Sequence, residues 1–194
     1  RITGADIEVA ATDVSAQLAA GDFKVGVEDG SLAMLLAADN TTAISATGSF
    51  VFEGGDFANA SATLVTVSLN DSTTDYAATP LTISIDGVSA DLTAGLNIQS
   101  VSVVGLAIDI SGFVSLGGDF GFRITGADIE VAATDVSAQL AAGDFSVGVE
   151  DGSLAMLLAA DNSIALSATG SFVFEGGDFA NASATLVTVS LNDS

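Results

Sequence analysis

The residues of this sequence that could do chemistry are almost all carboxylates. The chain holds 25 Asp and Glu side chains, no histidine and no cysteine. Histidine is the commonest general base and metal ligand, and cysteine supplies thiolate metal sites, so their absence removes most acid–base, nucleophilic and zinc chemistry. Carboxylates can still bind hard cations, because Ca²⁺ prefers clusters of oxygen ligands. The first chemistry to consider is therefore calcium binding.

Calcium ligands are predicted where acidic residues lie beside glycine in short stretches such as "EDG" (28–30) and "SIDG" (84–87). The nine-residue pattern of calcium-binding β-rolls and the spacing of an EF-hand are both missing. The alternative interpretation is that these residues only shape turns. Should a weak Ca²⁺ site form, carboxylates brought together between repeated units would build it. The candidate ligands are Asp22, Glu28, Asp29, Asp56, Asp86 and Asp119.

Catalysis is not predicted. The motif "GGDF" at 54–57, 117–120 and 176–179 matches a signature of cyclic-dinucleotide chemistry, but the chain has only 3 Lys and Arg residues to bind phosphates. A turn that delivers a phenylalanine to the core is the preferred interpretation. Paired carboxylates could also serve a β-helical polysaccharide-active enzyme. An active site is a single cleft, however, whereas these residues recur along the chain, so we predict no catalytic residues and no cofactor except a possible Ca²⁺.

The charge balance restricts the partners. The formal net charge is −22, and a chain this acidic repels nucleic acid and anionic membrane surfaces. The longest strongly apolar stretch, "SLAMLLAA" (31–38), is too short to span a bilayer as a helix. We therefore expect neither a nucleic-acid partner nor a membrane span in this segment. The predicted partners are other copies of the chain, or adjacent repeats.

A near-identical repeat organises the sequence. Residues 1–72 match 123–194, and the differences are Lys24/Ser146, Thr41/Ser163, Thr42/Ile164 and Ile44/Leu166. The predicted organisation is one full unit, 1–122, followed by a partial second copy, 123–194. A weaker likeness between "FVFEGGDF" (50–57) and "FVSLGGDF" (113–120) indicates sub-repeats of about 60 residues, and such fixed-period similarity is typical of solenoids and tandem arrays.

Alternation of apolar and small polar residues predicts strands along most of the chain, for example over 62–69, 81–85 and 96–110. Helix is the alternative for the alanine- and leucine-rich stretches 13–23 and 31–39, but the short intervals between turns favour strand. Gly, Asn and Asp tolerate the positive φ angles of tight turns. Turns are therefore predicted at 20–22, 28–30, 39–40, 54–56, 70–72, 86–87 and 117–119.

The predicted fold is an all-β, elongated tandem-repeat structure. We expect a continuous, antiparallel-rich β-solenoid or set of stacked sheets, to which successive units add. The alternative is a string of separate β-sandwich beads. No Pro-rich or Ser/Gly-rich linker separates the copies, and near-identical neighbouring beads tend to misfold into each other. Both points favour the continuous form. Because large aromatic residues are scarce, the core should be thin.

Several stretches carry a resemblance to a known class of repeats: "DISGFVSLGGDFGF" (109–122), "VGVEDGSLAMLLAADN" (25–40) and "ISATGSFVFEGGDF" (44–57). They resemble repeats of giant bacterial surface or secreted adhesin-like proteins, in which "GFVxLxGDFxF" and "VxVxxGSLxLxL" segments recur. The resemblance covers nearly the whole chain and rests on glycine, aspartate and aliphatic positions. It implies an extracellular or cell-surface location and a structural or adhesive role, with no active-site residues to transfer.

We therefore expect a non-catalytic, structural repeat region of a long extracellular fibre or cell-surface stalk, of the kind that builds a biofilm. The near-identity of the two copies favours a fibre. A Ca²⁺-dependent adhesin or binding module is the alternative, and a polysaccharide-active β-helical enzyme is a remote one. Arg1 and Arg123 lie at the same position of the two copies, so they should occupy equivalent places.

Overall fold

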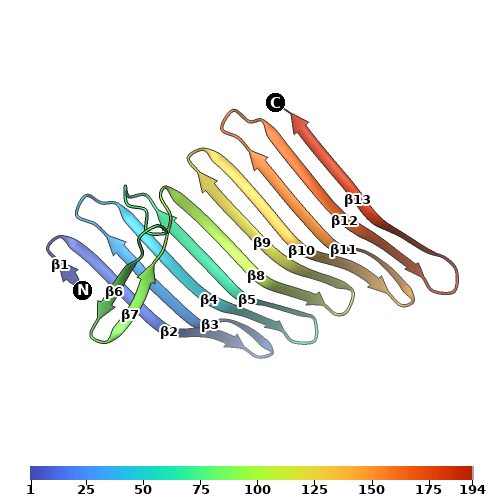
Figure 1. The fold of residues 1–194 in the computed structure, drawn as a ribbon. Coiled ribbons are helices and arrows are strands. Elements are labelled where there is room, and N and C mark those ends of the chain that lie inside the picture. The colour runs from blue at the N-terminus through green and yellow to red at the C-terminus, as the bar shows by residue number, and fades with distance from the viewer. Residues whose placement is uncertain (194) are drawn as a thin grey trace.

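The computed structural model describes residues 1–193, which form strands and the turns between them (Figure 1). Eleven strands build one antiparallel sheet, in which every strand except β6 and β7 takes its place in chain order. The predicted all-β, antiparallel character is confirmed, and strand is the correct assignment for both alanine-rich stretches. The strands are β1 (Ile2–Thr3), β2 (Asp6–Ala20), β3 (Phe23–Leu36), β4 (Thr42–Gly54), β5 (Ala58–Asn70), β6 (Leu81–Ile85), β7 (Val88–Leu92), β8 (Ile98–Ile110), β9 (Val114–Thr125), β10 (Asp128–Ala142), β11 (Phe145–Leu158), β12 (Ile164–Gly176) and β13 (Asn181–Asp193).

The main sheet is a single layer, in which tight turns return most long strands antiparallel to their predecessors, while residues 71–97, which include β6 and β7, connect β5 to its neighbour β8. Strands from 1–72 and from 123–194 belong to this one sheet, with β8 and β9 between them. The described residues therefore do not form separate β-sandwich beads. They also lack the stacked sheets of the predicted solenoid, since the only second layer is the β6–β7 hairpin, which lies in front of the first strands in Figure 1.

Two of the predicted turns are wrong. Residues 28–30 lie inside β3, where the pairing with β4 shifts between Glu28 and Ser31, and Asp29 has a φ of 51°. Residues 117–119 lie inside β9, which passes between irregular positions of both neighbouring strands. Residues 28–30 form a β-bulge, which inserts an extra residue without reversing the chain, whereas residues 117–119 continue β9 between the bulges of β8 and β10. Glycine and aspartate suit a bulge as well as a turn, so the sequence pattern does not separate the two.

The same ambiguity affects the proposed sub-repeat. "FVFEGGDF" (50–57) runs from the end of β4 into the turn before β5, whereas most of "FVSLGGDF" (113–120) lies within β9. Similar octapeptides thus adopt different structures in the two places. By contrast, the near-identical copies have corresponding strands: β2 is Asp6–Ala20 and β10 is Asp128–Ala142, the same stretch of the repeat.

Bulges on neighbouring strands lie close together, and glycines allow the strands to approach there. Gly48 of β4 is buried in this region. A Cβ atom added at Gly48 would lie 2.8 Å from Cγ1 of Val27 and 3.3 Å from Cα of Gly30. Neither contact can relax easily, because Val27 is β-branched and stiff and the second atom is backbone. Position 48 therefore requires glycine for packing.

We expect Gly48→Ala to lower the free energy of unfolding by about 1–2 kcal/mol, the usual cost of overpacking a tight site. Urea denaturation followed by circular dichroism measures it. Gly121→Ala is the matched control, because the nearest atom to an added Cβ there, the Ala132 carbonyl oxygen, is 4.0 Å away. Gly121→Ala should be neutral or slightly stabilising, since alanine restricts the unfolded chain. Equal losses for the two variants would contradict the packing argument.

The core is thin, as the shortage of large aromatics predicts, and it lies mainly under the hairpin. Strand β7 packs on β2, β3 and β4, and β6 packs on β2. Ile83 and Leu92 of the hairpin are 1% and 0% exposed, and with Tyr76 they form a cluster with Ala33 and Ala43 of the sheet. Small alanines on the sheet leave room for the larger hairpin side chains.

The two faces of the main sheet differ in chemistry. We call the face under the hairpin the hairpin face; in β4 it carries Ala43 and Ser45. The opposite face, which we call the open face, carries the alternate β4 residues, including Ile44, Phe50 and Phe52.

The apolar character of the open face continues across the sheet. Val67, Val101 and Phe122 pair across β5, β8 and β9. Each of these side chains is about 40% exposed. Val67 pairs with Ala46, which alternates with Ser45 and so lies on the open face. Nothing among the described residues covers this apolar row.

Candidate functional site

Two of the predicted calcium ligands, Asp22 and Asp56, lie in adjacent turns at the same end of the strands. Asp22 lies in the β2–β3 turn and Asp56 in the β4–β5 turn. The Gly55 amide donates to the Asp22 carbonyl oxygen at 3.1 Å, which ties the two turns together. The structure therefore brings these two acidic residues close in space.

The other predicted ligands are distributed elsewhere. Glu28 and Asp29 lie at the bulge of β3, and Asp86 lies in the β6–β7 turn. The carboxylate of Asp119, within β9, accepts a hydrogen bond from the Gly105 amide at 2.7 Å. Among residues 1–193, no group of three acidic side chains is placed to hold one metal ion. Calcium binding remains a prediction.

The corresponding turns of the second copy carry more net negative charge than the turns that contain Asp22 and Asp56. In the first copy the Lys24 ammonium donates to Glu53 at 2.6 Å, which raises the pKa of Lys24. The ion pair is half-exposed, so it contributes little to stability. In the second copy Ser146 takes the place of Lys24 opposite Glu175, and its buried hydroxyl has no partner among the described residues.

The loss of this lysine leaves the local carboxylates without a cation. A shallow hollow at this end of the strands is lined by Asp144, Glu175 and Asp178. They correspond to Asp22, Glu53 and Asp56 of the first copy. These turns are the place where the two copies differ in charge, because Lys24/Ser146 is the one difference between the copies that involves a charged residue. The sequence signal was the Lys24/Ser146 difference.

At the opposite end of the strands, one carboxylate stabilises a turn. In the β3–β4 turn, the Thr41 hydroxyl and amide donate to the Asp39 carboxylate at 2.7 and 3.0 Å. These hydrogen bonds favour the charged form and lower the pKa of Asp39 below 3.8. The corresponding hydrogen bonds from Ser163 lower the pKa of Asp161 in the second copy. Both carboxylates therefore stay charged in mildly acidic solution and hold their turns.

Because the folded-state pKa of Asp39 lies below the unfolded-state value, its contribution to stability is complete above that value and is lost as the pH falls through the folded-state pKa. We expect Thr41→Ala to raise the pKa of Asp39 toward 3.8, since the larger of the two hydrogen-bond effects disappears. Carboxyl ¹³C chemical shifts against pH measure it. Asp161 in the same molecule is the control. An unchanged Asp39 midpoint would show that the hydroxyl does not act on it.

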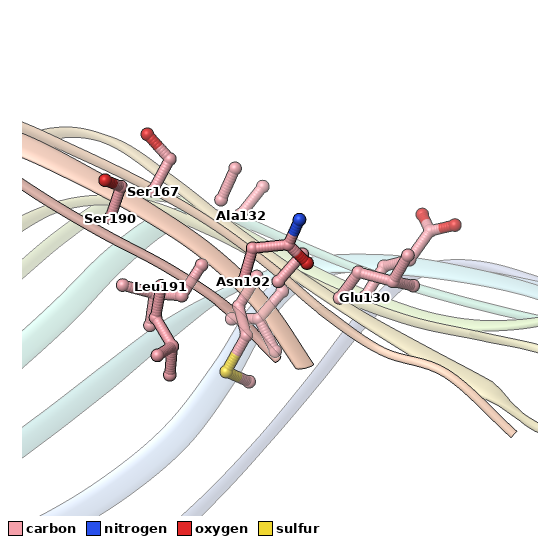
Figure 2. Close-up of a pocket in the computed structure, with 12 residues that line it drawn as sticks. Glu130, Ala132, Ser167, Ser190, Leu191 and Asn192 are labelled. Carbon is pink, nitrogen blue, oxygen red and sulfur yellow. The ribbon is translucent and has the colours of Figure 1, made fainter. Parts of the chain in front are cut away.

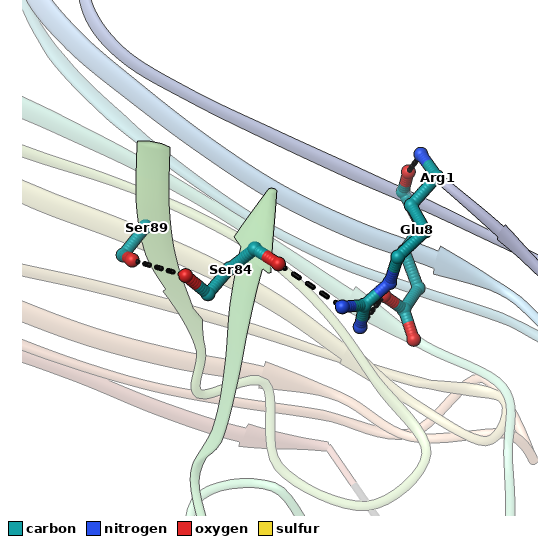
Figure 3. A network of polar contacts seen from close by, with 4 residues as sticks. All are labelled: Arg1, Glu8, Ser84 and Ser89. Atoms are coloured by element: carbon teal, nitrogen blue, oxygen red, sulfur yellow. Dashed lines mark hydrogen bonds and ion pairs between the residues drawn. The ribbon is translucent and has the colours of Figure 1, made fainter. Parts of the chain in front are cut away.

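Arg1 and Arg123 make the same ion pair. The Arg1 guanidinium pairs with Glu8, and the Arg123 guanidinium pairs with Glu130. In this respect the prediction of equivalent places is confirmed. Arg1 also donates to the Ser84 carbonyl oxygen of the hairpin at 3.1 Å, as Figure 3 shows. Arg1 thus links the sheet to the hairpin, whereas no hairpin lies over Arg123 among the described residues.

The second copy leaves a hollow of about 610 Å³ over β10–β13. Figure 2 shows Ala132, Ser167 and Ser190 on one side of the strands, with Leu191 directed to the other. The first three correspond to Ala10, Ser45 and Ser68, which lie on the hairpin face of the first copy. Sequence reasoning missed this surface. The signal that could have found it is that residues 73–122 follow the first copy only.

No helix long and apolar enough to cross a membrane occurs in residues 1–193. The candidate functional features are the acidic turns at the ends of the strands, the apolar open face and the uncovered hollow of the second copy. A comparison of the chain with protein-family models, curated proteins and solved structures finds no match.

Proposed function

We propose that the chain is a non-catalytic, structural repeat region of a long extracellular fibre or cell-surface stalk, whose partners are other copies or adjacent repeats. The observation that carries the proposal is the one sheet that includes the strands of both copies without interruption. In such a sheet, backbone hydrogen bonds between long strands can carry load along the assembly.

The edge strand β13 supports growth of this sheet. Its residues Asn181–Leu191 repeat Asn59–Leu69 of β5, which has β8 paired on its far side. Among residues 1–193, no strand pairs with the far side of β13. An edge strand presents unpaired backbone groups that can accept another strand. The same sequence therefore supports strand pairing on both sides, as an extending sheet requires.

The acidic composition supports controlled association. With a net charge of −22, molecules repel one another over distances comparable with the Debye length, about 30 Å at low salt and 8 Å at physiological ionic strength. The apolar open face favours contact at short range. Association should therefore increase with ionic strength.

Electron microscopy and analytical ultracentrifugation at low and physiological ionic strength test the proposal. We expect elongated assemblies that grow with protein concentration and salt. Val189→Lys, on the open face of β13, should weaken them, whereas the neighbouring Thr188→Lys, on the opposite face, is the control. Isolated globular monomers under every condition would contradict the proposal.

A Ca²⁺-dependent adhesin is the second candidate. Asp144, Glu175 and Asp178 line one hollow that has lost its lysine, and although they are not placed to hold one ion together, their combined charge favours the attraction of Ca²⁺. A ligand that binds only the folded state raises the melting temperature. We therefore expect Ca²⁺ to raise the melting temperature and a chelator to reverse the change, with Asp144→Asn and Asp178→Asn reducing the response. A melting temperature that is insensitive to Ca²⁺ and chelator would remove this candidate.

A further inference from the structure

The β6–β7 hairpin binds the first copy through a defined set of contacts. Its Ile83 and Leu92 cover Ala33 and Ala43, which are 1% and 2% exposed. The Thr93 amide donates to the Ser45 hydroxyl oxygen at 2.9 Å. Small side chains on the sheet thus form a seat for larger apolar side chains, and a hydroxyl at its border accepts a backbone hydrogen bond.

Two further side chains fix the hairpin at its ends. The Asn70 side-chain amide donates to the carbonyl oxygens of Thr74 and Ala94 at 2.8 and 3.1 Å. These residues precede β6 and follow β7, so Asn70 joins the start and the end of the hairpin segment. The Arg1 guanidinium holds the hairpin from another side through the Ser84 carbonyl oxygen (Figure 3).

The second copy has the same seat, and it is uncovered. Ala155 and Ala165, which correspond to Ala33 and Ala43, are exposed. Ser167 and Asn192, the counterparts of Ser45 and Asn70, are also exposed. Arg123 pairs with Glu130 as Arg1 pairs with Glu8. Every hairpin-binding residue of the sheet therefore has an identical counterpart.

The differences between the copies avoid this seat. Ile44/Leu166 and Thr42/Ile164 alternate with Ala43 and Ser45 along β4, so they lie on the open face. Lys24/Ser146 lies near the opposite end of the strands, and Thr41/Ser163 lies in a turn. The hollow over β10–β13, whose lining residues Figure 2 draws, consequently keeps the same small side chains and hydrogen-bonding groups that hold the hairpin in the first copy.

We infer that the hairpin face of β10, β11 and β12 is a binding site for a β-hairpin of the β6–β7 kind. The occupant is the hairpin of a further repeat unit with the sequence of residues 73–97. Its two large apolar side chains fill the seat over Ala155 and Ala165, and its backbone meets Ser167, Asn192 and Arg123. This site goes beyond the proposed fibre, since it describes how one hairpin recognises one patch whether or not a fibre forms.

A chain extended after Ser194 by a second copy of residues 73–97 tests the site. Tyr76 is the only tyrosine, so in a Tyr76→Phe background the tyrosine of the added segment is the sole reporter. We expect acrylamide to quench its fluorescence several-fold less than it quenches the free peptide of residues 73–97. The quenching should match that of Tyr76 in the unextended chain, where this side chain is buried.

Ala155→Glu places a charge in the seat, and it should make the added tyrosine as accessible as in the free peptide. Met156→Glu is the matched control, because the next residue of β11 points to the open face. Ala155 is exposed in the unextended chain, so circular dichroism should show an intact sheet.

An added tyrosine that is quenched like the free peptide without any substitution would overturn the inference. Equal effects of Ala155→Glu and Met156→Glu would do so as well. Protection that rises with protein concentration would instead assign the site to the hairpin of a second molecule and overturn the stated occupant.

Discussion

Leu92→Ala is expected to detach the β6–β7 hairpin from the main sheet. Leu92 is 0% exposed and belongs to the cluster with Ile83, Tyr76 and the sheet alanines Ala33 and Ala43. Removing a fully buried leucine side chain loses its transfer free energy and leaves a cavity, which together cost about 2–5 kcal/mol. The hairpin has no strand pairing with the main sheet, so side-chain packing supplies most of its attachment. A loss of this size is enough to open it.

The main sheet should survive this substitution, because β2–β5 and β8–β13 keep all their strand pairs. Native-state hydrogen exchange should therefore show fast exchange in β6 and β7 with little change in β10–β12. Tyrosine fluorescence reports the same event, since Tyr76 would become accessible to acrylamide.

Val88→Ala is the matched control for Leu92→Ala. Val88 lies in the same strand and is 38% exposed, so its truncation should leave the hairpin attached. A Leu92→Ala variant in which exchange increases equally in the hairpin and in β10–β12 would show that the hairpin and the sheet unfold together, which contradicts separate attachment.

The sequence predicts the local features of this fold better than its long-range contacts. The strands followed from period-two alternation, and most turns followed from Gly, Asn and Asp, because both are local properties of the backbone. Turns were wrongly predicted at 28–30, which is a bulge of β3, and at 117–119, where β9 lies between bulges of its neighbours, since glycine and aspartate occur in turns and at bulges alike. Which strands pair with which was predictable only where tight turns join neighbours.

The strand "LTISI" (81–85) and the turn at 86–87 were predicted correctly, but the docking of the β6–β7 hairpin on β2–β4 was not foreseen. Its contacts join Ile83 and Leu92 to alanines about fifty residues away in sequence. Alanine and serine on a strand give no signal that a larger side chain will cover them. The two copies show this directly, since identical alanines are buried at positions 33 and 43 and exposed at 155 and 165.

The difference between the covered first copy and the exposed second copy should also appear in the free energy of unfolding of Asn70→Ala. Asn70 is 2% exposed, and its amide donates to two carbonyl oxygens, of which that of Ala94 belongs to a buried residue. Its own carbonyl oxygen accepts from the Ser72 amide and hydroxyl at 3.0 and 2.7 Å. Truncation leaves these groups without their partner, so we expect a loss of about 2–3 kcal/mol in the free energy of unfolding, near the upper end for an unsatisfied buried group.

Asn192→Ala is the matched control for Asn70→Ala, because the sequence before it is the same. Two features of the surroundings differ among the described residues: no hairpin covers Asn192, and β13 lacks the neighbour that β8 provides for β5. Asn192 is exposed, and surface substitutions usually change stability by less than about 0.5 kcal/mol. Urea denaturation of both variants measures the difference. In the chain extended by a second copy of residues 73–97, the cost of Asn192→Ala should rise toward that of Asn70→Ala, because the added hairpin supplies the hydrogen-bond partners of the side-chain amide. If Asn192→Ala already costs as much in the unextended chain, the energy does not come from the hairpin, and the asparagine stabilises the end of the strand by itself.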